Sequence, residues 1–286
     1  MTSLIQTWRR RRWRPVPLSA GAAGLRPVAV VTGASEGIGR AFAFELARAG
    51  HDLLLVARSE APLEDTAVAV RAASGRRVEI VTADLSAPGF LAAIEDKLST
   101  VGAYPALLVN NAGMGLAGKF QKSDRAEVRR LIDLNMGALT ELTHWALSSM
   151  LDRGAGGIIN VSSLGGLVPG PNQAAYYASK AYVTSLTEAL SWETRGRGVV
   201  VTAVSPGPVR TEFHARMGSE ESKYLRILGT VSPERVAWAG YLGHRLGLTL
   251  VYPRLVDWPM AVSLRVMPHV IMVPIVSWLL RKRNGS

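Results

Sequence analysis

The segment Val28-Ala-Val-Val-Thr-Gly-Ala-Ser-Glu-Gly-Ile-Gly39 joins an apolar strand, a glycine-rich turn and the start of a helix. Gly33 permits a tight turn after the strand, Gly37 lets the backbone approach a pyrophosphate, and Gly39 lets the helix pack against the sheet. The helix N-terminus offers free N–H groups and a favourable dipole to an anion. The segment therefore predicts a phosphate-cradling turn, although its spacing is G-x-x-x-G-x-G and not the usual dinucleotide G-x-G-x-x-G.

Apolar runs and helical patterns alternate on both sides of this turn. Strands are expected at 28–32, 52–57, 78–83, 106–110, 157–162 and 199–205, and helices at 38–49, 62–73, 91–99, 123–150 and 174–195. The strands are continuous apolar runs, which is typical of a parallel sheet covered by helices on both faces. The predicted fold class is α/β, a doubly wound, Rossmann-like parallel sheet forming a single domain with an apolar C-terminal extension.

The chain divides into three parts by composition. Residues 1–26 are expected to form a basic N-terminal arm outside the core, 27–245 a dinucleotide-binding catalytic domain, and 246–286 an apolar, proline-broken extension with a basic end. The net charge of +11 resides at the two ends, because residues 28–253 carry 22 basic and 21 acidic side chains. A nucleic-acid surface needs basic residues clustered on a folded face, so no nucleic-acid partner is expected.

Cysteine is absent and the five histidines are scattered along the chain. This composition excludes disulfides and thiolate ligands, and no pair of histidines has a metal-ligand spacing. No metal site is expected. The predicted location is cytoplasmic, with peripheral contact at a membrane surface left open.

Six motifs resemble those of the short-chain dehydrogenase/reductase family over residues 27–235. They are the turn Thr32–Gly39, Asn110-Asn-Ala-Gly113, Asn135 in Leu-Asn-Met-Gly, Ser163 in Asn-Val-Ser-Ser, Tyr176-x-x-x-Lys180, and Pro206-Gly207-x-Val209-x-Thr211. The resemblance implies an oxidoreductase that acts on CH–OH groups and interconverts a ketone or aldehyde with an alcohol. Within the family, the chain looks most like reductases of ketoacyl, steroid and other lipid carbonyls.

The cofactor is expected to be NADP(H), with NAD(H) as the alternative. Ala57 stands where an acidic residue would bind the ribose hydroxyls, and Arg58 beside it suits a 2′-phosphate. Glu36 in the glycine turn is a departure, since NADP-binding relatives often have a basic residue there. The resemblance implies dinucleotide contacts from Gly33, Ser35, Glu36, Gly37, Ile38, Gly39, Arg58, Asp84, Leu85, Asn111, Ala112, Gly113, Tyr176, Lys180, Pro206, Gly207, Val209 and Thr211.

Tyr176 and Lys180 are four residues apart and share one face of the expected helix. The ammonium and the nicotinamide charge are expected to lower the tyrosine pKa from about 10, so that Tyr176 exchanges a proton with the substrate. Ser163, at a strand end, can stabilise the substrate oxygen. Strand alternation turns Ser162 to the other face. By resemblance, Lys180 also binds the nicotinamide ribose and Asn135 anchors a water.

The region after the Pro-Gly motif is expected to close a hydrophobic pocket. Phe213, Met217, Tyr224, Leu225, Ile227 and Leu228 suggest an acyl-chain or sterol-like substrate, although core packing explains them nearly as well. Residues 266–280 are apolar but shorter than the roughly 20 residues of a spanning helix. In-plane membrane contact, a dimer contact and a pocket lid all remain open, and Trp278 beside a basic cluster favours the first.

The family's relatives are commonly dimers or tetramers, which leaves a homodimer or homotetramer open by analogy. The alternative function is a non-catalytic, dinucleotide-binding regulatory protein. The complete set Asn135, Ser163, Tyr176 and Lys180 argues against that alternative.

Overall fold

The computed structural model describes residues 24–219 and 222–281. Most of the expected N-terminal arm and residues 282–286 therefore lie outside the described residues. The centre of the fold is a seven-stranded sheet in the order β3-β2-β1-β4-β5-β6-β7, in which every pairing is parallel. The strands are β1 Arg26–Thr32, β2 Asp52–Ala57, β3 Val78–Thr82, β4 Ala103–Asn110, β5 Gly156–Val161, β6 Val199–Val204 and β7 Leu250–Val251.

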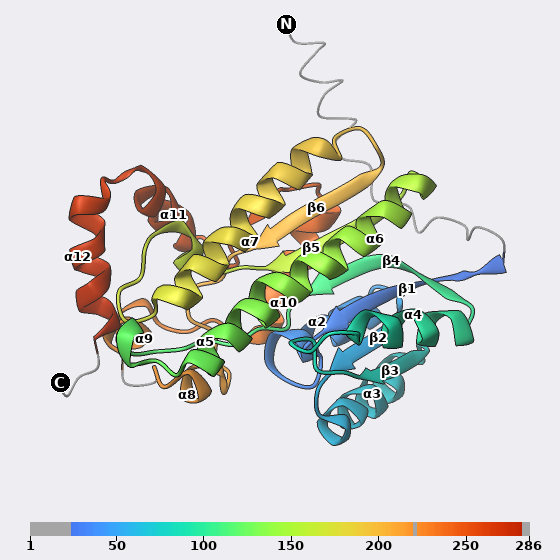
Figure 1. Cartoon of the computed structure of the whole chain (residues 1–286). Coiled ribbons are helices and arrows are strands. Elements are labelled where there is room, and N and C mark those ends of the chain that lie inside the picture. The colour runs from blue at the N-terminus through green and yellow to red at the C-terminus, as the bar shows by residue number, and fades with distance from the viewer. Residues whose placement is uncertain (1–23, 220–221, 282–286) are drawn as a thin grey trace, which may run out of the picture.

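Helices cover both faces of this sheet (Figure 1). The helices α2 Gly37–Arg48, α3 Glu60–Ser74 and α10 Pro233–Arg245 form one layer, and α4 Phe90–Thr100, α6 Leu139–Arg153 and α7 Ala174–Glu193 form the other. Along β1, Ala29 and Val31 pack toward the first layer, while Val28 and Val30 pack toward the second. Burial on both faces explains why the strands are apolar without alternation. The predicted fold class is confirmed.

The helix expected over 123–150 is interrupted at its centre. The chain forms α5 at Arg125–Ile132, a π-helical turn at Asp133–Ala138, and then α6. Single π-turns inside helices are often found at functional sites. Asn135 lies within this turn, buried at 1% exposure.

The C-terminal third contains elements that the sequence pattern did not predict. Two short helices, α8 Phe213–Met217 and α9 Lys223–Leu228, lie in the polar stretch after β6. The two-residue strand β7 pairs with β6, so the sheet takes in part of the stretch expected to be an extension.

Helices α11 Asp257–Val266 and α12 His269–Leu280 follow β7 and lie beyond the ends of β5 and β6 (Figure 1). They form a third apolar cluster, separate from the two that sandwich the sheet. Its buried members are Leu164, Val168, Ala261, Leu264, Met272, Val276 and Leu280. Among the described residues, no helix is both long and apolar enough to cross a bilayer.

Candidate active site

A pocket opens at the carboxyl ends of β1, β4, β5 and β6, where doubly wound sheets bind ligands. It extends from the glycine turn to α12. Of the residues proposed from the sequence, the pocket is lined by Gly33, Glu36, Gly37, Ile38, Asn111, Ala112, Gly113, Ser163, Tyr176, Lys180, Pro206, Gly207, Val209 and Thr211. Ser35, Gly39, Arg58, Asp84, Leu85 and Asn135 are not among its lining residues.

The glycine turn has the backbone geometry that an anion cradle needs. Gly33 and Gly37 have φ angles of 64° and 54°, which disfavour residues with a side chain. A Cβ on Gly39 would overlap the Gly33 carbonyl oxygen. The first hydrogen bond of α2 runs from the Arg40 N–H to the Glu36 carbonyl, and Glu36 gives no side-chain cap. The N–H groups of residues 37–39 therefore have no partner within the helix and suit a phosphate.

Hydrogen bonds fix this turn to the end of β4. The Thr32 hydroxyl accepts from the Asn111 and Ala112 N–H groups at 3.0 and 3.1 Å. The Asn111 side-chain amide donates to the Thr32 carbonyl at 2.9 Å. The crevice between β1 and β4 is therefore rigid before any ligand binds.

The acidic residue of the turn is paired with a distant arginine. The Arg216 guanidinium donates to the Glu36 carboxylate through both terminal nitrogens, one of them at 2.9 Å. Arg216 lies on α8, so this ion pair joins the glycine turn to the segment that follows the Pro-Gly motif. The arginine offsets the negative charge that the sequence placed beside the cradle.

Arg58 and Asp84 lie together at the ends of β2 and β3, outside the pocket. The Asp84 pKa is lowered, mainly by hydrogen bonds from Ser86, and also by the charges of Arg130 and Arg58. Arg58 is exposed, whereas the Leu85 side chain is buried in the core.

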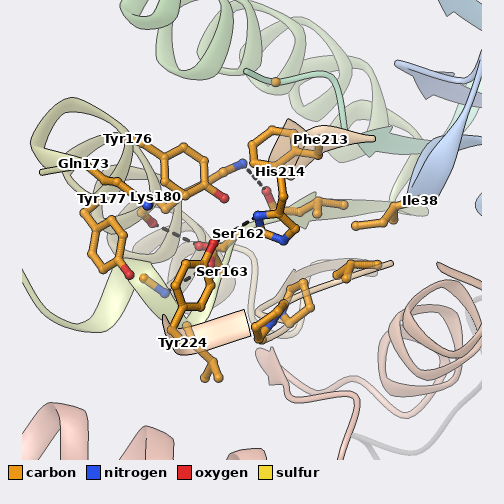
Figure 2. A pocket seen from close by; sticks show the side chains of 18 of the residues that line it. Ile38, Ser162, Ser163, Gln173, Tyr176, Tyr177, Lys180, Phe213, His214 and Tyr224 are labelled. Carbon is orange, nitrogen blue, oxygen red and sulfur yellow. Dashed lines mark hydrogen bonds between the residues drawn. The ribbon is translucent and has the colours of Figure 1, made fainter. Parts of the chain in front are cut away.

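Tyr176 and Lys180 occupy successive turns of α7 and face the end of β5. Ser163 directly follows that strand and lies close enough to the Tyr176 hydroxyl to lower the Tyr176 pKa. The Lys180 ammonium donates to the Val161 carbonyl at 2.8 Å and lies 5.9 Å from the centre of the Tyr176 ring. Figure 2 shows these side chains in the pocket with Gln173, Tyr177 and Tyr224.

Burial makes the Tyr176 phenol less acidic, which opposes the lowering expected from Lys180 and the nicotinamide charge together. Burial raises the Tyr176 pKa above its ordinary value and Tyr224 raises it further, while the hydrogen bond with Ser163 acts in the opposite direction. Burial also lowers the Lys180 pKa to about 8. Desolvation is thus the largest contribution to the Tyr176 pKa.

Ser162 and Asn135 have structural partners. The Ser162 hydroxyl donates to the Lys180 carbonyl at 3.0 Å and contacts the Thr184 hydroxyl at 2.7 Å, which ties α7 to β5. The Asn135 side chain accepts from the Met114 N–H and donates to the Met114 carbonyl, both at 2.8 Å. The π-turn thus holds the loop after β4 against α7.

The other half of the pocket is apolar and is roofed by the C-terminal helices. Met260, Leu264, Val276, Leu279 and Leu280 line it from α11 and α12. The inner side of α12 therefore acts as a pocket lid, one of the three roles left open by the sequence. Of the six residues expected to line the pocket, Phe213, Tyr224 and Leu228 do so. Leu225 is not among the lining residues, Met217 packs on Gly115, and Ile227 is 58% exposed.

A polar group inside this apolar half was missed by the sequence reasoning. The His214 imidazole is hydrogen-bonded to the Tyr224 hydroxyl at 3.0 Å. Gln173 is 3% exposed and lies close enough to Tyr224 to oppose the rise in the Tyr224 pKa that burial causes. Its amide nitrogen nevertheless has no hydrogen-bond partner of normal geometry among the described residues. The signal that could have identified Gln173 is its position three residues before Tyr176.

A buried ion pair connects the start of α11 to the end of α9. Asp257, fully buried at the start of α11, accepts from the Arg254 guanidinium at 2.7 and 3.0 Å. Arg254 also donates to the Leu228 carbonyl at 2.8 Å. The pair therefore links α11 to the end of α9, and its i,i+3 spacing was visible in the sequence.

Comparisons with known proteins agree with this geometry. The chain has a TM-score of 0.74 and 34% identity with a short-chain dehydrogenase from Sphingobium yanoikuyae in complex with NADPH, covering 84% of this chain and 93% of that one. It is 35% identical over 185 residues to 17-beta-hydroxysteroid dehydrogenase type 3 of Rattus norvegicus, covering 64% of this chain and 60% of that protein. It is 33% identical over 206 residues to very-long-chain 3-oxoacyl-CoA reductase of Anas platyrhynchos, covering 68% and 65%.

The matched segment spans less than two thirds of the hydroxysteroid dehydrogenase and of the 3-oxoacyl-CoA reductase. Residues 27–222 match the family model described as short chain dehydrogenase. With this match, the parallel sheet and the pocket at its carboxyl edge, the chain belongs to the short-chain dehydrogenase family.

Proposed function

We propose that this protein is an NADP(H)-dependent oxidoreductase that reduces a hydrophobic ketone or aldehyde to an alcohol. The observation that carries the proposal is that Tyr176, Ser163 and Lys180 line one pocket, between the glycine cradle and its apolar half. The similarity to an NADPH-bound dehydrogenase and to steroid and acyl-CoA oxidoreductases supports it.

The residues present fit a dinucleotide. The unpaired N–H groups at the start of α2 would hold the pyrophosphate, and Thr211 packs within 3.2 Å of where a Cβ on Gly37 would lie. Arg58 would bind a 2′-phosphate, helped by the absence of an acid at Ala57. The Arg216 partner of Glu36 removes much of the repulsion that this carboxylate would otherwise exert. A bound nicotinamide would supply the hydride.

The side chains of the pocket supply the proton. Ser163 donates a hydrogen bond to the carbonyl oxygen and stabilises the charge that develops there. Tyr176 keeps its proton at neutral pH because its pKa is raised, and an alkoxide is basic enough to take it. The Lys180 ammonium, still the main form at pH 7, stabilises the phenolate that remains. A protonated phenol is the form that donates the proton in the reductive direction.

The pocket also indicates the class of carbonyl compound. Its outer half is formed by aliphatic and aromatic side chains, which suit an acyl chain or a sterol-like skeleton. Gln173 lines this half of the pocket beside Tyr224.

The decisive test is NADPH consumption by wild type and Tyr176→Phe with a panel of long-chain ketones and ring ketones. The variant keeps the ring but loses the proton, so kcat should fall by about 10²- to 10⁴-fold. NADPH affinity, followed by fluorescence titration, should stay within about twofold. Full turnover by the variant would refute the assigned mechanism, and NADPH binding without turnover of any ketone by wild type would favour the regulatory alternative.

A further inference from the structure

Helices α11 and α12 expose apolar side chains on the side that faces away from the pocket. We define the outer face as Leu255, Trp258, Val262, Val266, Val270, Ile271, Ile275 and Trp278, whose exposed fractions lie between 45% and 85%. Consecutive members are one to four residues apart, mostly three or four, so they form a continuous stripe along each helix. Exposed apolar residues scattered singly are ordinary, whereas a contiguous patch of this kind marks an interaction surface.

The two helices are therefore apolar on opposite sides. Ala261, Leu264, Met272, Val276 and Leu280 pack inward over the pocket. The outer face stays largely exposed, although Lys223 lies over Trp278 and Tyr252 packs on Trp258. A helix that is hydrophobic all round is normally buried on all sides. Here the protein covers only the inner side, so the outer face requires an apolar partner.

The charge around the outer face favours an anionic partner. Residues 258–286 contain four lysines and arginines and no acidic residue. Among the described residues, Lys223 lies over the Trp278 ring at 4.4 Å, and Arg281 is exposed at the end of α12. Arg265 is paired with Glu188 on α7. Tryptophan beside basic residues is the composition of helices that lie at a bilayer surface.

The same charge disfavours a second copy of the chain. In a symmetric dimer each basic rim would meet another basic rim, because an isologous interface brings identical patches together. An anionic lipid headgroup instead neutralises the basic residues while the acyl chains cover the apolar stripe. Neither helix is long and apolar enough to span a bilayer, so a bilayer contact would lie in the plane of the surface.

We propose that the outer face docks in the plane of an anionic bilayer, with α12 as a shared wall between the lipid and the pocket. The inner side of α12 lines the pocket through Val276, Leu279 and Leu280. A substrate dissolved in the bilayer then reaches the pocket beside this wall without crossing water. The docking proposal depends only on the exposed side chains of the two helices, whereas the delivery step rests on the proposed function.

Docking is tested by flotation of the full chain with phosphatidylcholine vesicles prepared with and without phosphatidylserine. Wild type should float with the anionic vesicles, and raising salt from about 0.1 to about 1 M should weaken binding because the Debye length shortens from about 10 to about 3 Å. The double variant Val270→Glu/Ile271→Glu should lose about tenfold or more of this binding. The matched control is Val68→Glu, which alters an exposed valine of α3 and should bind like wild type.

Failure of wild type to float with anionic vesicles, or equal loss in the Val68→Glu control, would overturn the docking. Size-exclusion chromatography provides a second check. If wild type is an oligomer that Val270→Glu/Ile271→Glu converts to a monomer, the outer face is a self-association surface and the proposal is wrong.

Delivery is tested separately with two ketones, one soluble in water and one dissolved in the vesicles. The Val270→Glu/Ile271→Glu variant should reduce the soluble ketone like wild type, because neither residue lines the pocket, and should reduce the vesicle ketone about tenfold more slowly. Equal rates with both ketones would refute delivery. Vesicle binding without any ketone reduction would refute the proposed function and leave the docking intact.

Discussion

Two regions of the molecule differ in how their apolar residues are covered. One is the sheet with its two helical layers, and the other is formed by α8, α9, α11 and α12. In the first, which we call the body, every strand of the sheet centre is buried on both faces, and two large clusters pack against it. In the second, which we call the cap, apolar residues are covered on one side only, by a cluster with seven buried members. The glycine cradle thus lies in the region with the larger apolar clusters, whereas the apolar half of the pocket is covered by the region with the smaller one, where we expect lower local stability.

The largest expected effect is on the body, from two buried histidines. Burial, with the charges of Arg245 and Arg76, lowers the His51 pKa to about 4, and burial with His51 and Arg245 lowers the His244 pKa to about 3. Below pH 6.5 these histidines bind protons in the unfolded chain but remain neutral in the folded chain. Their contribution to the free energy of unfolding is therefore fully present above pH 6.5 and falls as the pH decreases. Their joint contribution lost at pH 5 is about 4 kcal/mol.

Urea unfolding at pH 7.5 and pH 5 measures this loss. The control is His144→Gln, at an exposed position on α6, which should show the same pH dependence as wild type. Equal unfolding free energies at the two pH values would show that these histidines are not kept neutral by the body.

The next largest effect is expected in the cap from Asp257→Ala. The change leaves the Arg254 guanidinium without its carboxylate, which typically costs about 3 kcal/mol for a buried pair. Because the pair joins α11 to α9, amide exchange should rise in α11 and α12 and remain unchanged in β1 and β4. Asp133→Ala, which breaks the exposed pair with Arg129, is the control and should cost less than about 1 kcal/mol. Global destabilisation by Asp257→Ala would remove the distinction between body and cap.

A smaller effect is expected from Gly39→Ala in the cradle. The new methyl group would overlap the Gly33 carbonyl oxygen, and such overpacking costs about 1–3 kcal/mol. The displaced backbone should also weaken NADPH binding in a fluorescence titration. Gly137→Ala is the control, because its nearest atom, the Ile132 carbonyl oxygen, is 3.9 Å away. Unchanged stability and binding would mean that the turn can relax, so the body is less rigid than its packing indicates.

The smallest effect separates the two sides of α12. Val276→Ala removes methyl groups from the pocket wall and should raise KM for a hydrophobic ketone about fivefold, which corresponds to about 1 kcal/mol. Ile275→Ala, at the adjacent exposed position, should leave KM unchanged and weaken vesicle binding. The opposite pattern would show that the two faces of this helix are assigned the wrong way round.

Local sequence signals were sufficient for the body. The Gly33–Gly39 spacing and the runs of apolar residues predicted the turn, six of the seven strands and their parallel arrangement, because backbone conformation and burial act over a few neighbouring residues. The seventh strand has only two residues and no signal of its own. The π-turn at Asn135 was also invisible, since its residues still read as a helix.

The candidate site likewise combines residues that the sequence predicted with contacts that it did not. The motif residues around Tyr176 were identifiable from the sequence because their spacing is local. Only the tertiary structure decided that Arg216 pairs with Glu36, 180 residues away, and that the Gln173 amide faces an apolar pocket without a partner. It also showed that burial opposes the expected lowering of the Tyr176 pKa, because desolvation depends on every element packed around the phenol, and no short stretch of sequence specifies that packing.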